Sequence, residues 1–139
     1  MTWRKKKLWI QDAETFSVEV VHRSHTHTLT MPDEVLHTWN VYAYIGIKHP
    51  RFRRITGRDF YQAAIEELPL HGGCTFLEKQ QFGVHELQKV GSDYRHYGDE
   101  CFERAKSKND ATAVFHDAQE LYDFLLAEQN ATTRPTTDV

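Results

Sequence analysis

The segment His37–Ile47 constrains the fold most, because its composition is typical of a β-strand. It is rich in aromatic and β-branched residues, which pack well on a pleated sheet. Lys48-His49-Pro50 ends it, since proline cannot donate a ladder hydrogen bond and restricts the residue before it. Trp3–Ile10 and Phe16–Val21 flank a polar turn and predict a hairpin earlier in the chain. We therefore expect His37–Ile47 to be the central strand of a mainly antiparallel sheet.

The segment His22–Thr30 continues the second strand of this hairpin with polar and β-branched residues. His25 and His27 are two positions apart, so on a strand their side chains point to the same face. Two interpretations stay open: a pair of metal-ligating imidazoles, or a solvent-facing strand. Met31–Glu34 then breaks the pattern.

The second half of the chain predicts two helices and two further strands. Arg58–Leu68 has apolar residues at helical spacing and stops at Pro69, and 112–129 carries an apolar stripe. Cys74–Lys79 and Val84–Tyr94 have strand composition and pair as a hairpin. The expected fold class is α+β, a mainly antiparallel sheet with helices at about 58–68 and 112–129 packed on it.

Composition predicts one domain over residues 1–130 and a threonine-rich, flexible tail at 131–139. Two cysteines do not make a disulfide framework, and the amino-terminal residues lack the apolar run of a signal peptide. No stretch approaches the roughly 18 apolar residues that a membrane-spanning helix needs. The net charge of −3 argues against a dedicated nucleic-acid-binding protein, although Lys5–Lys7 and the arginines of 51–58 form basic clusters. We expect a soluble, cytoplasmic protein.

The segment Leu70–Thr75 has a pattern that core packing does not explain. Gly72 and Gly73 follow His71 at the mouth of a predicted strand. A glycine pair permits positive φ and lets backbone amides approach a ligand closely. The same pair is common in ordinary turns, so the segment is either a ligand-binding loop or a plain turn.

The segment from Asp93 to Asp99 brings two carboxylates and His96 into seven residues at the end of a predicted strand. Carboxylate and imidazole suit zinc, manganese or iron, and such a set leaves coordination positions open for water. His71 from the neighbouring strand would complete a mononuclear site. The alternative is a hydrogen-bonded network that fixes a loop. Even without a metal, a carboxylate beside an imidazole is the arrangement of a general base.

Two neighbouring features add to this candidate site. Cys74, beside His71, is either a nucleophile or, as is commoner for a cysteine on a strand, a small buried hydrophobe. Arg51 and Arg54 follow His49-Pro50, and guanidinium groups pair with phosphates and carboxylates. These arginines therefore suggest an anionic small-molecule ligand such as a nucleotide.

Four segments together resemble a family of small uncharacterised bacteriophage and prophage proteins. They are Trp39-Asn40-Val41-Tyr42, His49-Pro50, His71-Gly72-Gly73-Cys74-Thr75 and Gly91-Ser92-Asp93-Tyr94-Arg95-His96-Tyr97-Gly98-Asp99. The family has, in this order, Asn-Gly-Tyr-Val, His-Pro, His-Gly-Gly-Leu-Thr and Gly-Phe-Asp-Cys-x-His-x-Gly-Asp. The match covers about 39–129 and leaves the first 38 residues outside. Val41, Cys74 and Tyr94 depart from the pattern, and the last removes a cysteine that could have supplied a metal-ligating thiolate.

The resemblance implies a phage setting inside a bacterial host cell, and it brings no reaction with it. The leading hypothesis is a metal-dependent hydrolase of a small anionic, nucleotide-like substrate. Its catalytic or metal-ligating residues would be His71, Asp93, His96 and Asp99, and its divalent ion zinc or manganese. The ligand-binding candidates are His49, Arg51, Arg54, Gly72 and Gly73. The alternative is a non-enzymatic protein that binds a host defence protein or sequesters a signalling nucleotide.

Overall fold

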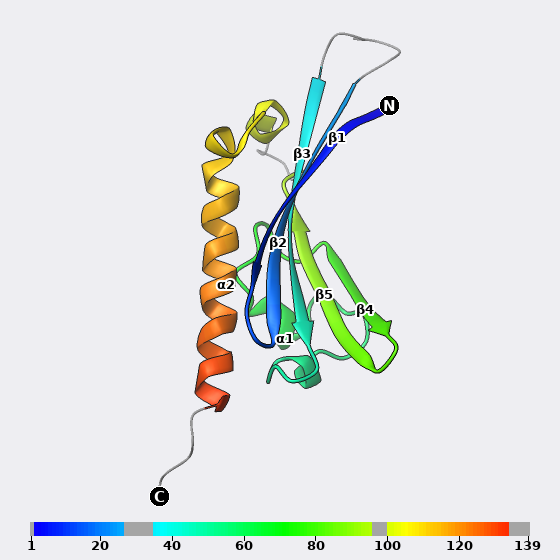
Figure 1. Cartoon of the computed structure of the whole chain (residues 1–139), viewed down its shortest axis with the longest axis vertical. Helices are drawn as coiled ribbons and strands as arrows, with labels where there is room; N and C mark the ends of the chain where they lie inside the picture. Colours follow the sequence, from blue (N-terminus) through cyan, green and yellow to red (C-terminus); the bar gives the residue numbers. More distant parts are fainter. Residues whose placement is uncertain (1, 27–34, 96–99, 134–139) are drawn as a thin grey trace, which may run out of the picture.

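In the described part of the chain, a five-stranded antiparallel sheet forms the centre of the fold (Figure 1). The computed structural model describes residues 2–26, 35–95 and 100–133. The strands are β1 (Thr2–Asp12), β2 (Phe16–Thr26), β3 (Val35–Gly46), β4 (Phe76–Phe82) and β5 (His85–Asp93). Their order is β1-β2-β3-β5-β4. The predicted α+β class and the central position of β3 are confirmed, and β1 and β2 are integral strands of the sheet.

Two α-helices accompany the sheet in the residues that the structure describes, and the first is much shorter than expected. Helix α2 (Thr112–Thr133) matches the predicted second helix, extends into the predicted tail and leaves 134–139 outside the described residues. Helix α1 is a single turn (Ala63–Glu66), so the helix expected at 58–68 is wrong in extent. Side chains explain this: Gln62 Nε2 donates to the carbonyl oxygens of Thr56 and Asp59, at 2.7 and 2.9 Å. Such side-chain bonds to the backbone compete with helix formation.

Helix α2 runs along one face of the sheet and closes the main core (Figure 1). Alternate residues of β2 and β3 point toward it, among them Val20, Trp39 and Val41, which are 3% exposed or less. Leu121 and Leu125 on α2 are fully buried against them. Full burial of one such side chain stabilises the fold by about 1.5–3 kcal/mol. No helix in the described part of the chain is long and apolar enough to cross a membrane.

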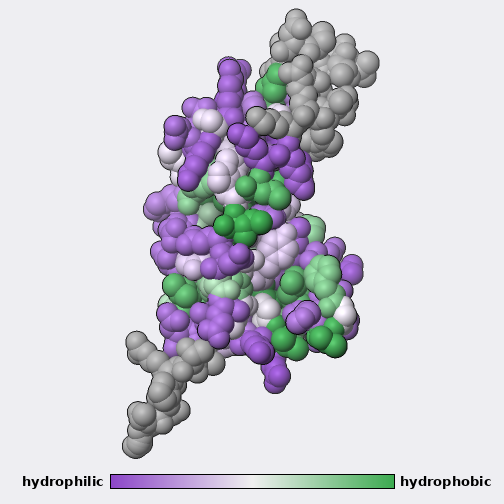
Figure 2. Space-filling model, in the orientation of Figure 1, coloured by the Kyte–Doolittle hydropathy of each residue, from purple (hydrophilic) through white to green (hydrophobic). Residues whose placement is uncertain are grey.

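Three short 3₁₀ turns complete the described chain: η1 (Phe52–Arg54), η2 (Glu100–Arg104) and η3 (Lys108–Ala111). Trp39 Nε1 donates to the carbonyl oxygen of Ala105, between η2 and η3, at 3.2 Å. Figure 2 shows that hydrophilic side chains cover most of one side of the molecule, with hydrophobic ones in smaller groups.

The histidines of β2 are buried, in contrast to the solvent-facing strand that one interpretation expected. His25 is 2% exposed, so that interpretation is wrong for this residue, and His27 lies outside the described residues. His22 stacks on Trp39 with ring centroids 4.1 Å apart, and its Nε2 lies 2.8 Å from His37 Nδ1. The imidazoles of His22 and His37 therefore belong to the core beside α2.

Candidate functional site

The two glycine-containing segments meet in the structure, as the sequence predicted. The Thr75 amide donates to the Gly91 carbonyl oxygen at 2.9 Å, and the Asp93 amide donates to Thr75 Oγ1 at 3.1 Å. Glycine is required at Gly91, because a Cβ there would lie 2.3 Å from Tyr42 Cδ1. The sequence pattern therefore marks a real junction between the loop before β4 and the end of β5.

A histidine, a tyrosine and an aspartate come together at this junction. The ring of His71 stacks on that of Tyr94, with centroids 4.2 Å apart and planes 13° from parallel. The Tyr94 hydroxyl donates to Asp117 Oδ2 at 2.7 Å, and His71 Nδ1 lies 3.8 Å from the same oxygen. Tyr94 is buried, whereas His71 and Asp117 are 29% and 31% exposed. We call these three residues the His71 cluster.

Asp117 is a functional candidate that the sequence pattern did not indicate. It lies on α2, next to the core residue Ala118, and far in sequence from both glycine-containing segments. The one available signal was a carboxylate adjoining the apolar stripe of a helix. Tyr94, which stands where the phage-protein pattern has cysteine, also has a role here. Its ring stacks on His71 and its hydroxyl donates to Asp117.

The structure does not bring Asp93 into the His71 cluster. Side chains alternate between the faces of a strand, so Asp93 shares the face of its partner Asn40 and of Tyr42, turned away from α2. Its Oδ1 accepts from the Arg95 amide at 3.3 Å. His96 and Asp99 lie outside the described residues, so their place as ligands stays a prediction.

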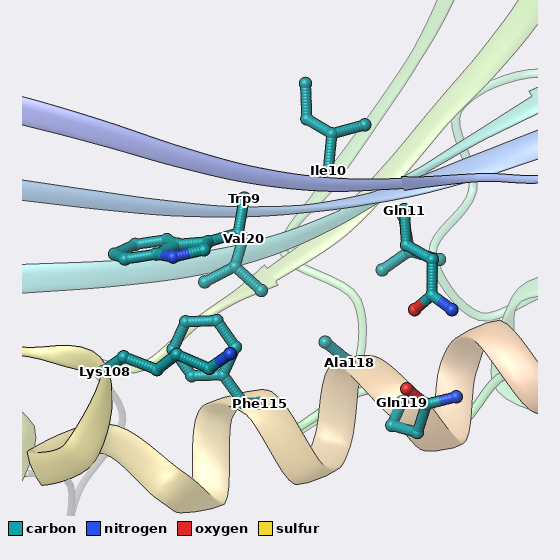
Figure 3. Close-up of a pocket in the computed structure, with 9 residues that line it drawn as sticks. Trp9, Ile10, Gln11, Val20, Lys108, Phe115, Ala118 and Gln119 are labelled. Atoms are coloured by element: carbon teal, nitrogen blue, oxygen red, sulfur yellow. The ribbon is translucent and has the colours of Figure 1, made fainter.

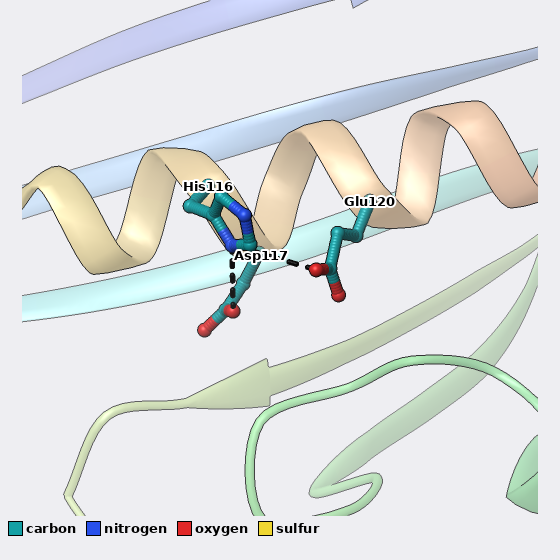
Figure 4. Close-up of side chains that lie close together, drawn as sticks. All are labelled: His116, Asp117 and Glu120. Atoms are coloured by element: carbon teal, nitrogen blue, oxygen red, sulfur yellow. Dashed lines mark ion pairs between the residues drawn. The ribbon is translucent and has the colours of Figure 1, made fainter.

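A second group of metal-type donors adjoins Asp117 on α2 (Figure 4). His116 Nδ1 lies 3.9 Å from Asp117 Oδ1 and 3.5 Å from Glu120 Oε1. Donor atoms of these three residues lie within 4.8 Å of one another. Imidazole with two carboxylates is a donor set that fits zinc or manganese. Asp117 thus offers one carboxylate oxygen toward His71 and Tyr94 and the other toward His116.

The glycine pair has the backbone conformation that the sequence predicted. Gly72 and Gly73 have φ of 67° and 89°, in the left-handed region that favours glycine. Both line a cavity of about 250 Å³ together with Cys74 and apolar residues around α1, such as Ile65. Burial raises the pKa of the Cys74 thiol, and its Sγ donates to the Phe76 carbonyl oxygen at 3.2 Å. Cys74 therefore has the environment of a neutral thiol.

His49 is part of the core rather than of the cavity beside the glycines. It is 1% exposed, its Nε2 donates to the Leu125 carbonyl oxygen at 2.9 Å, and its Nδ1 accepts from the Arg51 amide at 3.0 Å. These partners fix the neutral tautomer, and burial lowers the pKa of His49. His49 thereby fastens the end of β3 to helix α2.

The two arginines proposed as ligand-binding residues contact carboxylates of the protein itself. Arg51 is 2% exposed and binds Glu128 with Nε and Nη2, at 2.8 and 2.6 Å. Its Nη1 donates to the Ala64 carbonyl oxygen at 2.8 Å and to Glu67 at 3.0 Å. Arg54 donates to Glu67 at 2.7 Å. The Arg51 contacts join η1 to both helices.

Comparison with known proteins does not assign the chain to a family. No protein-family model, no curated protein and no solved structure matches the chain. The resemblance to phage proteins therefore stays a prediction, and the chemistry has to be inferred from the site itself.

Proposed function

We propose that the protein is a small metal-dependent hydrolase of an anionic, nucleotide-like substrate, with its reaction centre at the His71 cluster. The observation that carries the proposal is the position of Asp117 Oδ2. This oxygen accepts a hydrogen bond from the Tyr94 hydroxyl at 2.7 Å and lies 3.8 Å from His71 Nδ1. Three separate parts of the chain supply these residues. A loop that only needed to be fixed would not require a partly exposed imidazole beside a carboxylate.

Each residue of the cluster has a distinct role in this proposal. His71 accepts a proton from the attacking water, and Asp117 orients its imidazole. The 3.8 Å separation exceeds hydrogen-bond distance, as is common for catalytic pairs without a ligand. Tyr94 positions both residues. A divalent ion held by Asp117 with His116 and Glu120 would supply Lewis acidity and leave the His71 imidazole free to accept the proton.

Gly72 and Gly73 directly follow His71 in the chain, and the cavity that they line is the candidate position for the substrate. Glu66 also lines it and the Gly73 amide donates to the Leu70 carbonyl oxygen at 3.1 Å, so the divalent ion would neutralise the anionic group. In the phage setting that the resemblance implies, hydrolysis of a nucleotide signal would act against host defence. A ligand bound there and recovered intact would instead favour the alternative, a protein that sequesters the signal.

The proposal is tested with protein purified without an affinity tag. We expect stoichiometric zinc or manganese by elemental analysis, a lower melting temperature after chelation, and turnover of at least one member of a nucleotide panel by chromatography. His71→Phe keeps the ring stack and Asp117→Asn keeps an acceptor for Tyr94, so both should fold. Each should lose about 100-fold or more in kcat/KM.

Asp123→Asn is the matched control, because it removes an exposed carboxylate from the same helix. It should leave turnover unchanged. Absence of stoichiometric metal together with a melting temperature insensitive to chelation would contradict metal dependence. Equal activity of Asp117→Asn and the wild type would exclude the His71 cluster as the reaction centre.

A further inference from the structure

Two adjoining cavities lie between the β1–β2 edge of the sheet and the start of α2. The larger is about 390 Å³ and the smaller about 220 Å³. They share Trp9 and Lys108 as lining residues, so we treat them as one groove, called here the lysine groove. Neither is lined by His71, Tyr94 or Asp117. The groove is therefore separate from the proposed reaction centre.

The smaller cavity is strongly basic. It is lined by Lys7 from β1, by Lys106 just before η3 and by Lys108 at the start of η3, in a chain whose net charge is −3. Asp110, the carboxylate next to these lysines in sequence, accepts from the Lys106 amide and the Ser107 hydroxyl at 3.1 and 3.2 Å. Three lysines that line one small cavity match the charge and the donor needs of a phosphate group, while the Ser107 hydroxyl donates to Asp110.

The larger cavity offers an apolar bed for a flat ring (Figure 3). Trp9 and Val20 from the strands face Phe115 and Ala118 from α2. Trp9 meets Phe115 edge to face, with centroids 5.0 Å apart, and Lys108 Nζ lies 5.0 Å from the Phe115 centroid. The cavity volume falls in the range typical of small-ligand sites. Lys108 thus stands where the apolar and the basic parts join.

Amide side chains complete the larger cavity. Gln11 and Gln119 line it from the strand side and the helix side, respectively (Figure 3). Gln119 Nε2 donates to Asp123 at 2.9 Å, and each amide carries both donors and acceptors. Such groups recognise the edge of a heteroaromatic base, whereas a simple aliphatic anion would have no use for them.

We propose that the lysine groove binds a mononucleotide-class ligand. The phosphate contacts Lys7, Lys106 and Lys108, and the base lies over Phe115 and Ala118. The site does not depend on the proposed hydrolase activity, since it shares no residue with the His71 cluster. It also assigns a role to Lys7, whose basic cluster the proposed function leaves unused.

Calorimetric titrations of the full chain with AMP, adenosine and inorganic phosphate, with a chelator present to stop metal-dependent turnover, test the proposal. AMP should bind at least tenfold more tightly than either fragment, and more weakly as salt rises. Lys106→Gln and Lys108→Gln should each weaken AMP about tenfold, from loss of one charged hydrogen bond. Gln119→Phe changes an exposed residue. The larger side chain should obstruct the larger cavity and thereby weaken AMP binding.

Lys79→Gln is the control, because Lys79 is an exposed lysine on β4 paired with Glu86 at 3.2 Å. It and His71→Phe should bind AMP like the wild type. No binding of AMP at millimolar concentration, or binding unaffected by both groove lysine variants, would overturn the proposal. Tighter binding of a single-stranded oligonucleotide than of AMP would also overturn it, in favour of a nucleic-acid surface. Weaker AMP binding by His71→Phe would place the ligand at the His71 cluster instead.

Discussion

Replacing Arg51 by methionine should destabilise the protein strongly, because the guanidinium is a buried junction between η1 and the two helices. The change keeps an unbranched apolar stem and removes the guanidinium hydrogen bonds to Glu128, Glu67 and the Ala64 carbonyl oxygen. Loss of one partner from a fully buried ion pair costs about 3–5 kcal/mol. Glu128 is 24% exposed and Glu67 47% exposed, so water offsets part of that loss. We expect a net loss of about 3 kcal/mol in the free energy of unfolding.

Thermal and urea unfolding followed by circular dichroism measure this loss. A 3 kcal/mol change corresponds to a fall of about 10 °C in melting temperature for a domain of this size. Arg54→Gln is the control, since Arg54 is 46% exposed and exposed pairs contribute about 0–1 kcal/mol. An Arg51→Met protein as stable as the wild type would refute the structural role and return Arg51 to the set of ligand-binding candidates.

Three further predictions concern pH, cysteine reactivity and a close approach of backbone. Burial lowers the pKa of His49 and of His37 below the ordinary 6.5, so below pH 6.5 the unfolded chain binds protons that the folded chain excludes. Urea unfolding should show full stability above pH 6.5 and a fall of up to about 1.4 kcal/mol per pH unit per histidine below it; a flat profile would contradict neutral, buried imidazoles. Iodoacetamide should modify the exposed Cys101 well before Cys74, because burial raises the pKa of the Cys74 thiol. Mass spectrometry of timed digests measures the order of modification, and the reverse order would contradict the burial of Cys74. Gly91→Ala should lose about 1–3 kcal/mol of stability by urea unfolding, since its Cβ would fall 2.3 Å from a tyrosine ring carbon; an unchanged midpoint would mean that the ring moves freely.

The sheet was predictable from sequence because its strands carry period-two patterns and aromatic or β-branched residues. The long stripe of α2 was equally clear. Helix α1 was overestimated, because periodicity takes no account of the bonds that Gln62 and Asp59 make to nearby backbone. The burial of His25 was also missed, since a polar residue on a strand gives no sign of what covers it.

The candidate site was predictable only in part. Glycines at Gly72, Gly73 and Gly91 marked the backbone junction, because left-handed φ and close packing leave few alternatives to glycine. Asp117 reaches the junction by tertiary packing of α2, which local spacing does not encode. Arg51 was predicted to bind a ligand because local sequence shows its charge. It does not show that Glu128, far along the chain, pairs with that charge in the folded protein.

Titration of the isotope-labelled protein with Mn²⁺, followed by NMR, tests the central claim most directly. Paramagnetic broadening falls off steeply with distance from the bound ion and therefore reports its position. We predict that amides of His71, Gly72, Tyr94 and Asp117 broaden first, at substoichiometric Mn²⁺, and that Asp117→Asn abolishes this selectivity. Broadening spread evenly over exposed carboxylates, or concentrated away from His71 and Asp117, would contradict a metal-dependent site at the His71 cluster.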